Sequence, residues 1–198
     1  MKLVIAATGA SGAPYLQRLL DYLKPMNSGS GQQHEIHLVL SPFAQQVIHH
    51  EIGKLHLSED VLQYSNQTMN APFASGSSQF DAMVIIPCSM GSVGRIATGI
   101  SNSLITRAAD VFLKERRKLI LVARETPWNL LHAKNVTTLL EAGAIFLPAM
   151  PSFYSKPQSL EELVDTVVWR ILDQLGLPAP NACRWQGNES PRSLRSHL

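Results

Sequence analysis

The chain has 198 residues, of which 45% are hydrophobic and 16% are charged, and its formal net charge is +2. This length suits one domain, the weak net charge gives no support for a nucleic-acid partner, and no apolar run reaches the roughly 18 residues of a membrane span. The two cysteines form neither a disulfide framework nor a zinc motif, so we expect a reducing cytoplasm, and the low charged fraction suggests surface buried against other subunits.

The apolar pattern predicts strands that alternate with helices. A buried strand over 3–7 runs into the glycine- and serine-rich loop 8–12, and a helix with leucines at i, i+3, i+4 and i+7 follows. The later predicted elements are a strand over 36–40, a helix from Pro42 toward Glu51, a stretch of weak periodicity over 55–80, a strand over 82–86, helices over 93–98 and 103–114, a strand over 119–123, a helix up to Glu141 and a strand over 144–147. This alternation predicts a parallel sheet covered on both faces.

The last helix has the most complete sequence signature. Ser159 is a typical N-cap residue, and Glu162 lies at the position that closes a capping box. An apolar face extends from Leu160 to Leu175, and Gly176 terminates the helix.

Polar and glycine residues collect where the predicted strands end. In parallel sheets of this kind, ligands bind beyond the carboxyl ends of the strands. The residues at these ends are 8–12, Ser41, 88–92, Arg124 with Glu125, and 148–154. We therefore expect the functional site at this edge of the sheet.

The loop 8–12 has the composition of a phosphate-binding loop. Its glycines let the backbone approach a ligand, Ser11 adds a hydroxyl, and the following helix offers free N–H groups and the positive end of its dipole. The full Gly-x-Gly-x-x-Gly pattern is missing, and Ser41 stands where an acidic residue would hold the ribose of a dinucleotide. A mononucleotide phosphate fits better, and a tight strand-to-helix turn without a ligand is the alternative.

Two later strand ends allow a functional and a plain interpretation. The segment 87–92 is a second loop suited to an anion, in which Cys88 is better explained as a small buried residue than as a nucleophile. Arg124 and Glu125 are suited to an anion clamp and a proton-transferring carboxylate, but also to a surface base and a helix N-terminal acid.

Arg107 and Lys114 lie two turns apart on one predicted helix. From this spacing both side chains are able to reach one anionic ligand, and they are equally able to pair with Asp110 and Glu115. The seven histidines show no metal-binding spacing, so no metal site is expected.

Taken together, these segments resemble the flavin prenyltransferases of the UbiX type. The resemblance rests on 8–13, 86–90, 104–111 with 113–117, 124–127, and 147–154 with 157–158, and it runs from about residue 2 to Trp185. It implies an α/β fold, Rossmann-like and in three layers, with a mostly parallel sheet. It also implies one flavin-binding domain over 1–186, followed by a polar tail over 187–198 that we expect to be flexible.

The resemblance implies a metal-independent transferase. Such enzymes transfer a dimethylallyl group from dimethylallyl phosphate to N5 and then C6 of reduced flavin mononucleotide (FMN). The product, prenyl-FMN, is handed to a UbiD-type decarboxylase, in many organisms within ubiquinone biosynthesis. The family commonly forms dodecamers whose active sites lie between subunits, so a homo-oligomer is expected here.

Residue roles follow by matching this chain to the family motifs. The flavin-binding residues are Gly9, Ala10, Ser11, Ser41, Ser89, Met90, Gly91, Ser92, Arg107 and Arg124. The residues expected to bind dimethylallyl phosphate are Lys114, Tyr154, Arg170 and Trp185, with the pair Arg184-Trp185 closing over the site. The catalytic residues are Ser11, Glu51, Lys114 and Glu125, of which Glu125 is the expected proton shuttle in ring closure.

Some positions depart from the family pattern, and two other functions compete. Gly91, Ala123 and Ser155-Lys156 are unusual, although none removes a residue with a named role. Flavin-dependent cysteine decarboxylases carry Pro-x-Met-Asn-x-x-Met-Trp, which differs here after Met150. A non-catalytic flavin carrier would keep the first loop but would not need Lys114, Glu125, Tyr154 and Arg170 together.

Overall fold

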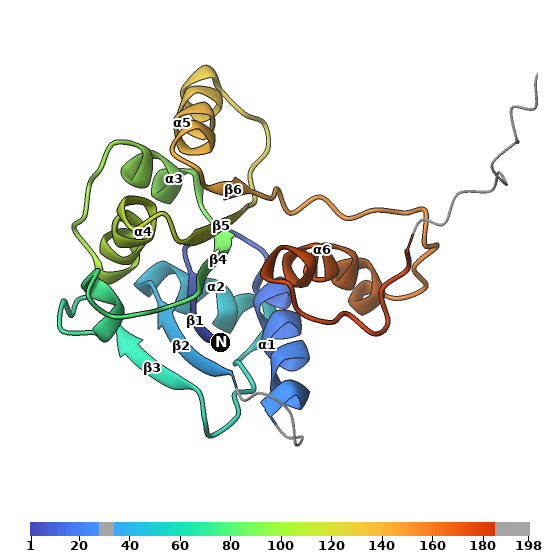
Figure 1. Ribbon diagram of the computed structural model, residues 1–198. Coiled ribbons are helices and arrows are strands. Elements are labelled where there is room, and N and C mark those ends of the chain that lie inside the picture. The colour runs from blue at the N-terminus through green and yellow to red at the C-terminus, as the bar shows by residue number, and fades with distance from the viewer. Residues whose placement is uncertain (28–33, 185–198) are drawn as a thin grey trace, which may run out of the picture.

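The computed structural model describes residues 1–27 and 34–184 and has three layers, with a central sheet between two layers of helices (Figure 1). In the described residues the sheet has six strands in the order β3-β2-β1-β4-β5-β6, and every neighbouring pair is parallel. The strands are β1 (Lys2–Ala7), β2 (Glu35–Leu40), β3 (Leu62–Ser65), β4 (Ala82–Cys88), β5 (Lys118–Ala123) and β6 (Ile145–Phe146). The expected three-layer α/β fold is confirmed, with a sheet that is parallel throughout.

Each face of the sheet has its own hydrophobic core. The helices are α1 (Ala13–Asn27), α2 (Pro42–Ile52), α3 (Met90–Ala97), α4 (Leu104–Lys114), α5 (Leu130–Glu141) and α6 (Leu160–Leu175), with a short 3-10 helix η1 (Pro72–Ala74). Leu3 and Ile5 pack with α1, α2 and α6 on one face, whereas Val4 and Ala6 pack with α3, α4 and α5 on the other. Because successive strand side chains point to opposite faces, a strand covered on both sides is a continuous apolar run.

β4 continues two residues beyond its predicted end at Ile86. Pro87 has no N–H for the sheet, and the pairing of β4 with β5 shifts register between Ile85 and Cys88. The Pro87 carbonyl accepts the Thr8 N–H at 3.0 Å, which ties the end of β1 to the end of β4. The predicted break is therefore an irregularity inside the strand.

The edge strand β3 lies in the stretch of weak periodicity, where no strand is predicted. Three of its four residues are exposed, and it pairs only with β2 among the described strands. A short exposed edge strand lacks the apolar run that identifies a buried one.

The last helix, α6, begins at the predicted N-cap, because the Ser159 hydroxyl accepts the Glu162 N–H at 3.1 Å. The Glu162 carboxylate accepts the Gln158 N–H at 2.6 Å, so it caps one residue further out than expected. Leu160, in the first turn of the predicted apolar face, is not buried. Leu160 is 65% exposed, because it borders an open hollow between α6 and α1.

The topology places a crevice at the carboxyl ends of β1, β2 and β4. β2 and β3 lie on one side of β1, and β4, β5 and β6 lie on its other side. The direction in which strands are added to the sheet therefore reverses at β1. Ligands of open α/β sheets bind at such a reversal. After β6, the chain extends away from the sheet and passes beside α6 (Figure 1). It then turns back and enters α6. No helix in the described ranges has the length and apolar character to cross a membrane.

Candidate flavin and allylic phosphate sites

A cavity of about 270 Å³ opens at this crevice. Its polar lining includes six hydroxyl side chains, those of Thr8, Ser41, Ser89, Ser92, Ser103 and Thr106. Three of the serines are N-caps. Ser41 accepts the Ala44 N–H at the start of α2, Ser89 accepts the Ser92 N–H at the start of α3, and Ser103 accepts the Thr106 N–H at the start of α4. Three helix N-termini thus meet at one cavity, and their dipoles favour an anion such as a phosphate.

Thr8 fixes the two loops that border this cavity. Its hydroxyl accepts the Ser89 N–H at 2.7 Å and donates to the Pro87 carbonyl at 3.2 Å. The loop after β1 and the loop after β4 are therefore held together at the point where the strand order reverses.

Arg95 provides the positive charge of this cavity. It is the one charged side chain among the described lining residues, and no carboxylate of the described chain lies within ion-pair distance of it. A guanidinium with no counter-ion among the described residues, at a hydroxyl-lined cavity, is suited to a phosphate. Sequence reasoning missed Arg95, because its spacing from Ser89 and Ser92 has no recognised pattern.

The N-terminus of α1 is already capped by a carboxylate. Glu51 Oε2 accepts the Gly12 N–H at 3.0 Å and the Ala13 N–H at 2.8 Å. Burial opposes ionisation of Glu51, but hydrogen bonds from Ser11, Gly12 and Ala13 outweigh it and lower the pKa of the carboxyl group. The N–H groups that we expected to be free for a phosphate are therefore used within the chain. The cavity at α2, α3 and α4 is the better seat for that phosphate.

Ser11, Glu51 and Arg124 are brought together beside this cavity. Arg124 Nε donates to the Ser11 carbonyl at 3.2 Å, and the Ser11 side chain contributes to the lowered pKa of the Glu51 carboxyl group. Glu125 follows directly, exposed, with its carboxylate accepting the Thr126 N–H at 3.1 Å. Three of the four predicted catalytic residues thus lie at one edge of the sheet.

Three further predicted flavin-binding residues, in the loop after β1 and at the start of α3, lie at the same edge. Ala10 is buried in the loop after β1, Met90 is buried in the first turn of α3, and Gly91 is exposed beside it. Cys88 is completely buried, and burial raises the pKa of its thiol to about 12. This agrees with the interpretation of Cys88 as a packing residue. No three potential metal ligands cluster in the described ranges.

Arg107 and Lys114 are held away from the cavity. Arg107 Nη1 lies 2.9 Å from Asp110 Oδ2 and its Nε donates to the Ala74 carbonyl at 3.0 Å. Lys114 Nζ pairs with the Glu115 carboxylate. In the single chain, Arg107 and Lys114 therefore pair with neighbouring carboxylates and do not point together at one ligand site.

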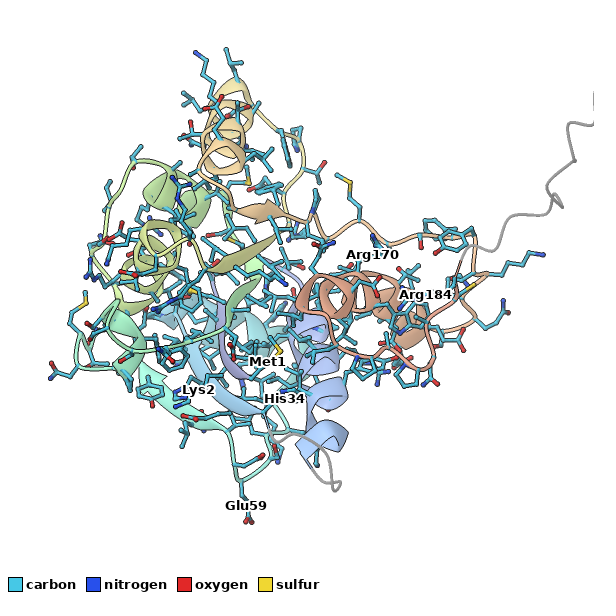
Figure 2. The ribbon with its side chains drawn as sticks, in the orientation of Figure 1. Met1, Lys2, His34, Glu59, Arg170 and Arg184 are labelled. Carbon is cyan, nitrogen blue, oxygen red and sulfur yellow. The ribbon has the colours of Figure 1, made fainter. Side chains whose placement is uncertain are left out.

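Tyr154 and Arg170 lie together in a second cavity of about 350 Å³ beside α6. This cavity shares no lining residue with the first, because its walls come from α6, the segment after β6 and the segment after α6. Arg184 also lines it, and Arg170 and Arg184 lie along α6 on the same side of the molecule (Figure 2). Trp185, predicted to close over the substrate, lies outside the described residues.

Asn66 is a further residue that the sequence did not reveal. It lines the first cavity, and its backbone and side-chain oxygens accept the N–H groups of Leu104 and Ile105 at 2.9 and 3.1 Å. The only available signal was the cap-type residues ahead of α4, which indicate a helix start but not its partner.

Gly9 permits the close approach of the first loop to α2, which gives a stability prediction. A Cβ added at Gly9 would lie 2.5 Å from the Phe43 Cβ, whereas one added at Gly91 would meet only Arg95 Nη1 at 3.9 Å. Gly9→Ala is expected to lower the free energy of unfolding by about 1–3 kcal/mol, because α2 must shift. Gly91→Ala, the control, is expected to be neutral or slightly stabilising in urea unfolding. Equal effects of the two variants would contradict this role of Gly9.

Comparisons with known proteins agree with this geometry. The Flavoprotein family model matches residues 1–172. A probable UbiX-like flavin prenyltransferase of Bacillus subtilis is 46% identical over 197 residues, which cover 97% of this chain and 93% of that protein. A dodecameric FMN-dependent UbiX-like decarboxylase from Escherichia coli O157:H7 superposes with a TM-score of 0.88 at 40% identity, over 94% of this chain and 100% of the other. AnUbiX in complex with FMN and dimethylallyl pyrophosphate superposes with a TM-score of 0.87 at 39% identity, over 95% and 98%.

Proposed function

Since this chain belongs to the Flavoprotein family and, within it, to the flavin prenyltransferases of the UbiX type, we propose that it joins a dimethylallyl group from dimethylallyl phosphate to N5 and C6 of reduced FMN. The product would be prenyl-FMN. A UbiD-type decarboxylase is the proposed recipient, within ubiquinone biosynthesis, and the family resemblance alone supports this part. The cytoplasm is the proposed compartment because the two cysteines form no disulfide framework.

The observation that carries the proposal is the cavity where α2, α3 and α4 begin. Three N-cap serines, the hydroxyls of Ser92 and Thr106, and the unpaired Arg95 provide donors and positive charge without a carboxylate among the described lining residues. This chemistry fits the phosphate of a mononucleotide. Gly9 belongs to the same lining, so the loop after β1 borders the proposed flavin site.

The proposed reaction has two bond-forming steps. In the first, N5 of the reduced flavin bonds to the terminal allylic carbon, the C–O bond breaks, phosphate leaves with the electron pair, and N5 loses its proton. In the second, the alkene takes up a proton, C6 bonds to the tertiary carbon and C6 loses a proton, so no external oxidant is needed. Lys and Arg donors stabilise the departing phosphate, and a carboxylate at Glu125 is suited to the proton transfers. Ser11, which contributes to the lowered pKa of the Glu51 carboxyl group, is proposed to assist loss of the first proton.

The proposed site needs more than one subunit. Lys114 ends α4 just before β5, and Glu125 follows just after β5, so one strand separates them. The six residues of β5 span about 17 Å, which is further than a lysine side chain reaches. If both residues act on one substrate, they must come from different copies of the chain. The exposed apolar residues Trp128 and Leu130, close to Glu125, support a surface that another copy covers in a dodecamer.

Anaerobic incubation of the protein with reduced FMN and dimethylallyl phosphate tests this function. The expected result is a flavin whose mass has increased by one dimethylallyl group and whose absorbance spectrum has changed. Dimethylallyl pyrophosphate, tried in parallel, shows which donor is preferred. Bound but unaltered flavin with both donors would refute the assignment and favour a flavin carrier.

Replacing Arg95 tests the proposed phosphate seat. Arg95→Gln is expected to raise the Kd for FMN by roughly tenfold to a hundredfold, because a charge-assisted hydrogen bond to the phosphate is lost. The Kd for riboflavin, which lacks the phosphate, should not change, and neither Kd should change in Lys134→Gln, an exposed position on α5. Quenching of flavin fluorescence on binding measures the Kd of FMN and of riboflavin for the wild type and for both variants. Equal weakening of FMN and riboflavin binding would show that Arg95 supports the fold and does not bind the phosphate.

A further inference from the structure

Asp173 lies near the end of α6, where its carboxylate binds two arginines at once. Arg170, one turn earlier on the helix, places Nη1 2.7 Å from Asp173 Oδ2. Arg184 approaches from the segment after α6, with Nη1 2.7 Å from Oδ2 and Nη2 2.7 Å from Oδ1. The Asp173 side chain is 19% exposed, and hydrogen bonding from Arg184 lowers the pKa of its carboxyl group. Asp173 is therefore ionised and in contact with both guanidinium groups.

The turn after α6 brings Arg184 back to the helix. Gly176 has φ 72° and ψ 26°, a left-handed conformation that ends the helix at low cost. The Leu177 N–H then bonds the Leu172 carbonyl at 2.9 Å. Further along, the Tyr154 hydroxyl donates to the Cys183 carbonyl at 3.3 Å. The two-point contact of Arg184 with Asp173 therefore ties the segment 177–184 to α6, together with the apolar packing of Leu177 and Ala179.

The two arginines border the second cavity, which Tyr154 also lines. Asp173 uses one Nη of Arg170 and both Nη atoms of Arg184, but each guanidinium has five N–H donors. Donors therefore remain on both arginines. Two positive charges and one negative charge leave one positive charge in excess at the cavity, which suits a phosphate monoester.

We propose that Asp173 is a positioning residue that holds Arg170 and Arg184 side by side, so that both bind the phosphate of the allylic substrate. The identity of this ligand rests on the proposed function. The carboxylate offsets the repulsion between the two guanidinium groups and restricts their rotamers before the substrate arrives, so less freedom is lost on binding. Asp173 would itself repel a phosphate, but its two-point pair with Arg184 neutralises it, so positioning is the larger effect.

Asp173→Asn keeps the size of the side chain and removes its charge. We expect the KM for dimethylallyl phosphate to rise about tenfold, since two long side chains lose their restraint, while kcat and the Kd for FMN stay close to wild type. Asp173→Glu should recover part of the loss. Asp21→Asn is the control for loss of a helical ion pair, because Asp21 pairs with Arg18 at 3.9 Å on α1, outside both cavities. An unchanged KM in Asp173→Asn, or a parallel loss of FMN binding, would overturn the proposal.

Titration with inorganic phosphate separates this proposal from the proposed function. In FMN-loaded protein the first cavity is filled, so phosphate binding reports on the second. We expect Asp173→Asn to weaken phosphate binding about tenfold, and Arg184→Gln to weaken it little further in that background, because the two residues act as one unit. Full additivity of the two losses would overturn the positioning role. If the wild-type protein formed no prenylated flavin, the proposed function would be refuted. The phosphate titration would still show whether Asp173 positions the two arginines.

Discussion

Mixed oligomers of Lys114→Ala and Glu125→Gln subunits are expected to recover about a quarter of the wild-type prenylation rate, although each variant alone should be slower by a factor of about 100 or more. The quarter is expected if each site draws Lys114 from one subunit and Glu125 from another. With equal and random mixing, half of the sites have an intact Lys114, and half of those have an intact Glu125.

The physical basis is the length and rigidity of β5. This strand is buried along five of its six residues and lies between β4 and β6, so it does not bend to bring its two ends together. Lys114 lies beside Gly76 and Glu115 at the amino end, and Glu125 lies beyond the carboxyl end, next to Arg124 and Ser11. In one chain, these two residues therefore lie at opposite ends of the strands, Lys114 at the amino end of β5 and Glu125 beyond its carboxyl end.

The subunits can be mixed by co-expression with two different tags and purification over both. A second mixture, of wild type with the double variant Lys114→Ala/Glu125→Gln, sharpens the test. It should also give about a quarter of the wild-type rate if the two residues come from different subunits, but about half if they come from the same subunit. A mixture of single variants as slow as its parents would show that the two residues act from one chain.

The sequence predicts the buried strands and the edge strand β6, but it does not predict the other edge strand, β3. The apolar runs 82–86 and 119–123 correspond to β4 (Ala82–Cys88) and β5 (Lys118–Ala123), because strands covered on both faces cannot tolerate polar side chains. β3 has no such run. α3 begins at Met90, three residues before the predicted start at 93. The sequence places the start too late because Gly91 and Gly94 weaken the helical pattern.

Sheet topology determines one part of the site, and the orientation of the helices determines the other. Ser41, Ser89 and Ser92 share a cavity because parallel strands end at one edge. The capping of α1 by Glu51 and the position of Arg95 depend on how α2 and α3 lie on the sheet, which local spacing does not encode. Motif resemblance also groups Lys114 with the others without saying which copy of the chain supplies it.

A buried charge network between α1 and α6 was equally invisible to local patterns. Asp165 is separated from Arg18 by 147 positions, yet Arg18 Nε and Nη2 bind its two oxygens at 2.7 and 2.6 Å. The Tyr22 hydroxyl donates to the same carboxylate at 3.0 Å, and Trp169 Nε1 donates to that hydroxyl at 2.9 Å. The Asp165 side chain is 8% exposed, so these partners, and not water, supply most of its hydrogen bonds. In the sequence it is only one acidic residue within an apolar helical face.

Asp165→Ala is expected to lower the free energy of unfolding by about 3 kcal/mol, because it leaves the Arg18 guanidinium and the Tyr22 hydroxyl without their acceptor. We place the loss at the low end for a buried pair, since 30% of the Arg18 side chain is exposed to water. Urea unfolding at fixed protein concentration measures it. Asp21→Asn, which removes the long contact with the same arginine, should cost less than about 0.5 kcal/mol.

The double variant Arg18→Met/Asp165→Leu distinguishes a stabilising ion pair from a penalty that appears only when one partner is removed. It should recover most of the lost stability, because apolar side chains of similar size replace both charges without leaving one unpaired. FMN binding should survive in all these variants, since α1 and α6 supply none of the described lining of the first cavity. A loss below about 1 kcal/mol in Asp165→Ala would mean that the network contributes no more than a surface pair, and that apolar packing alone holds α6 on α1.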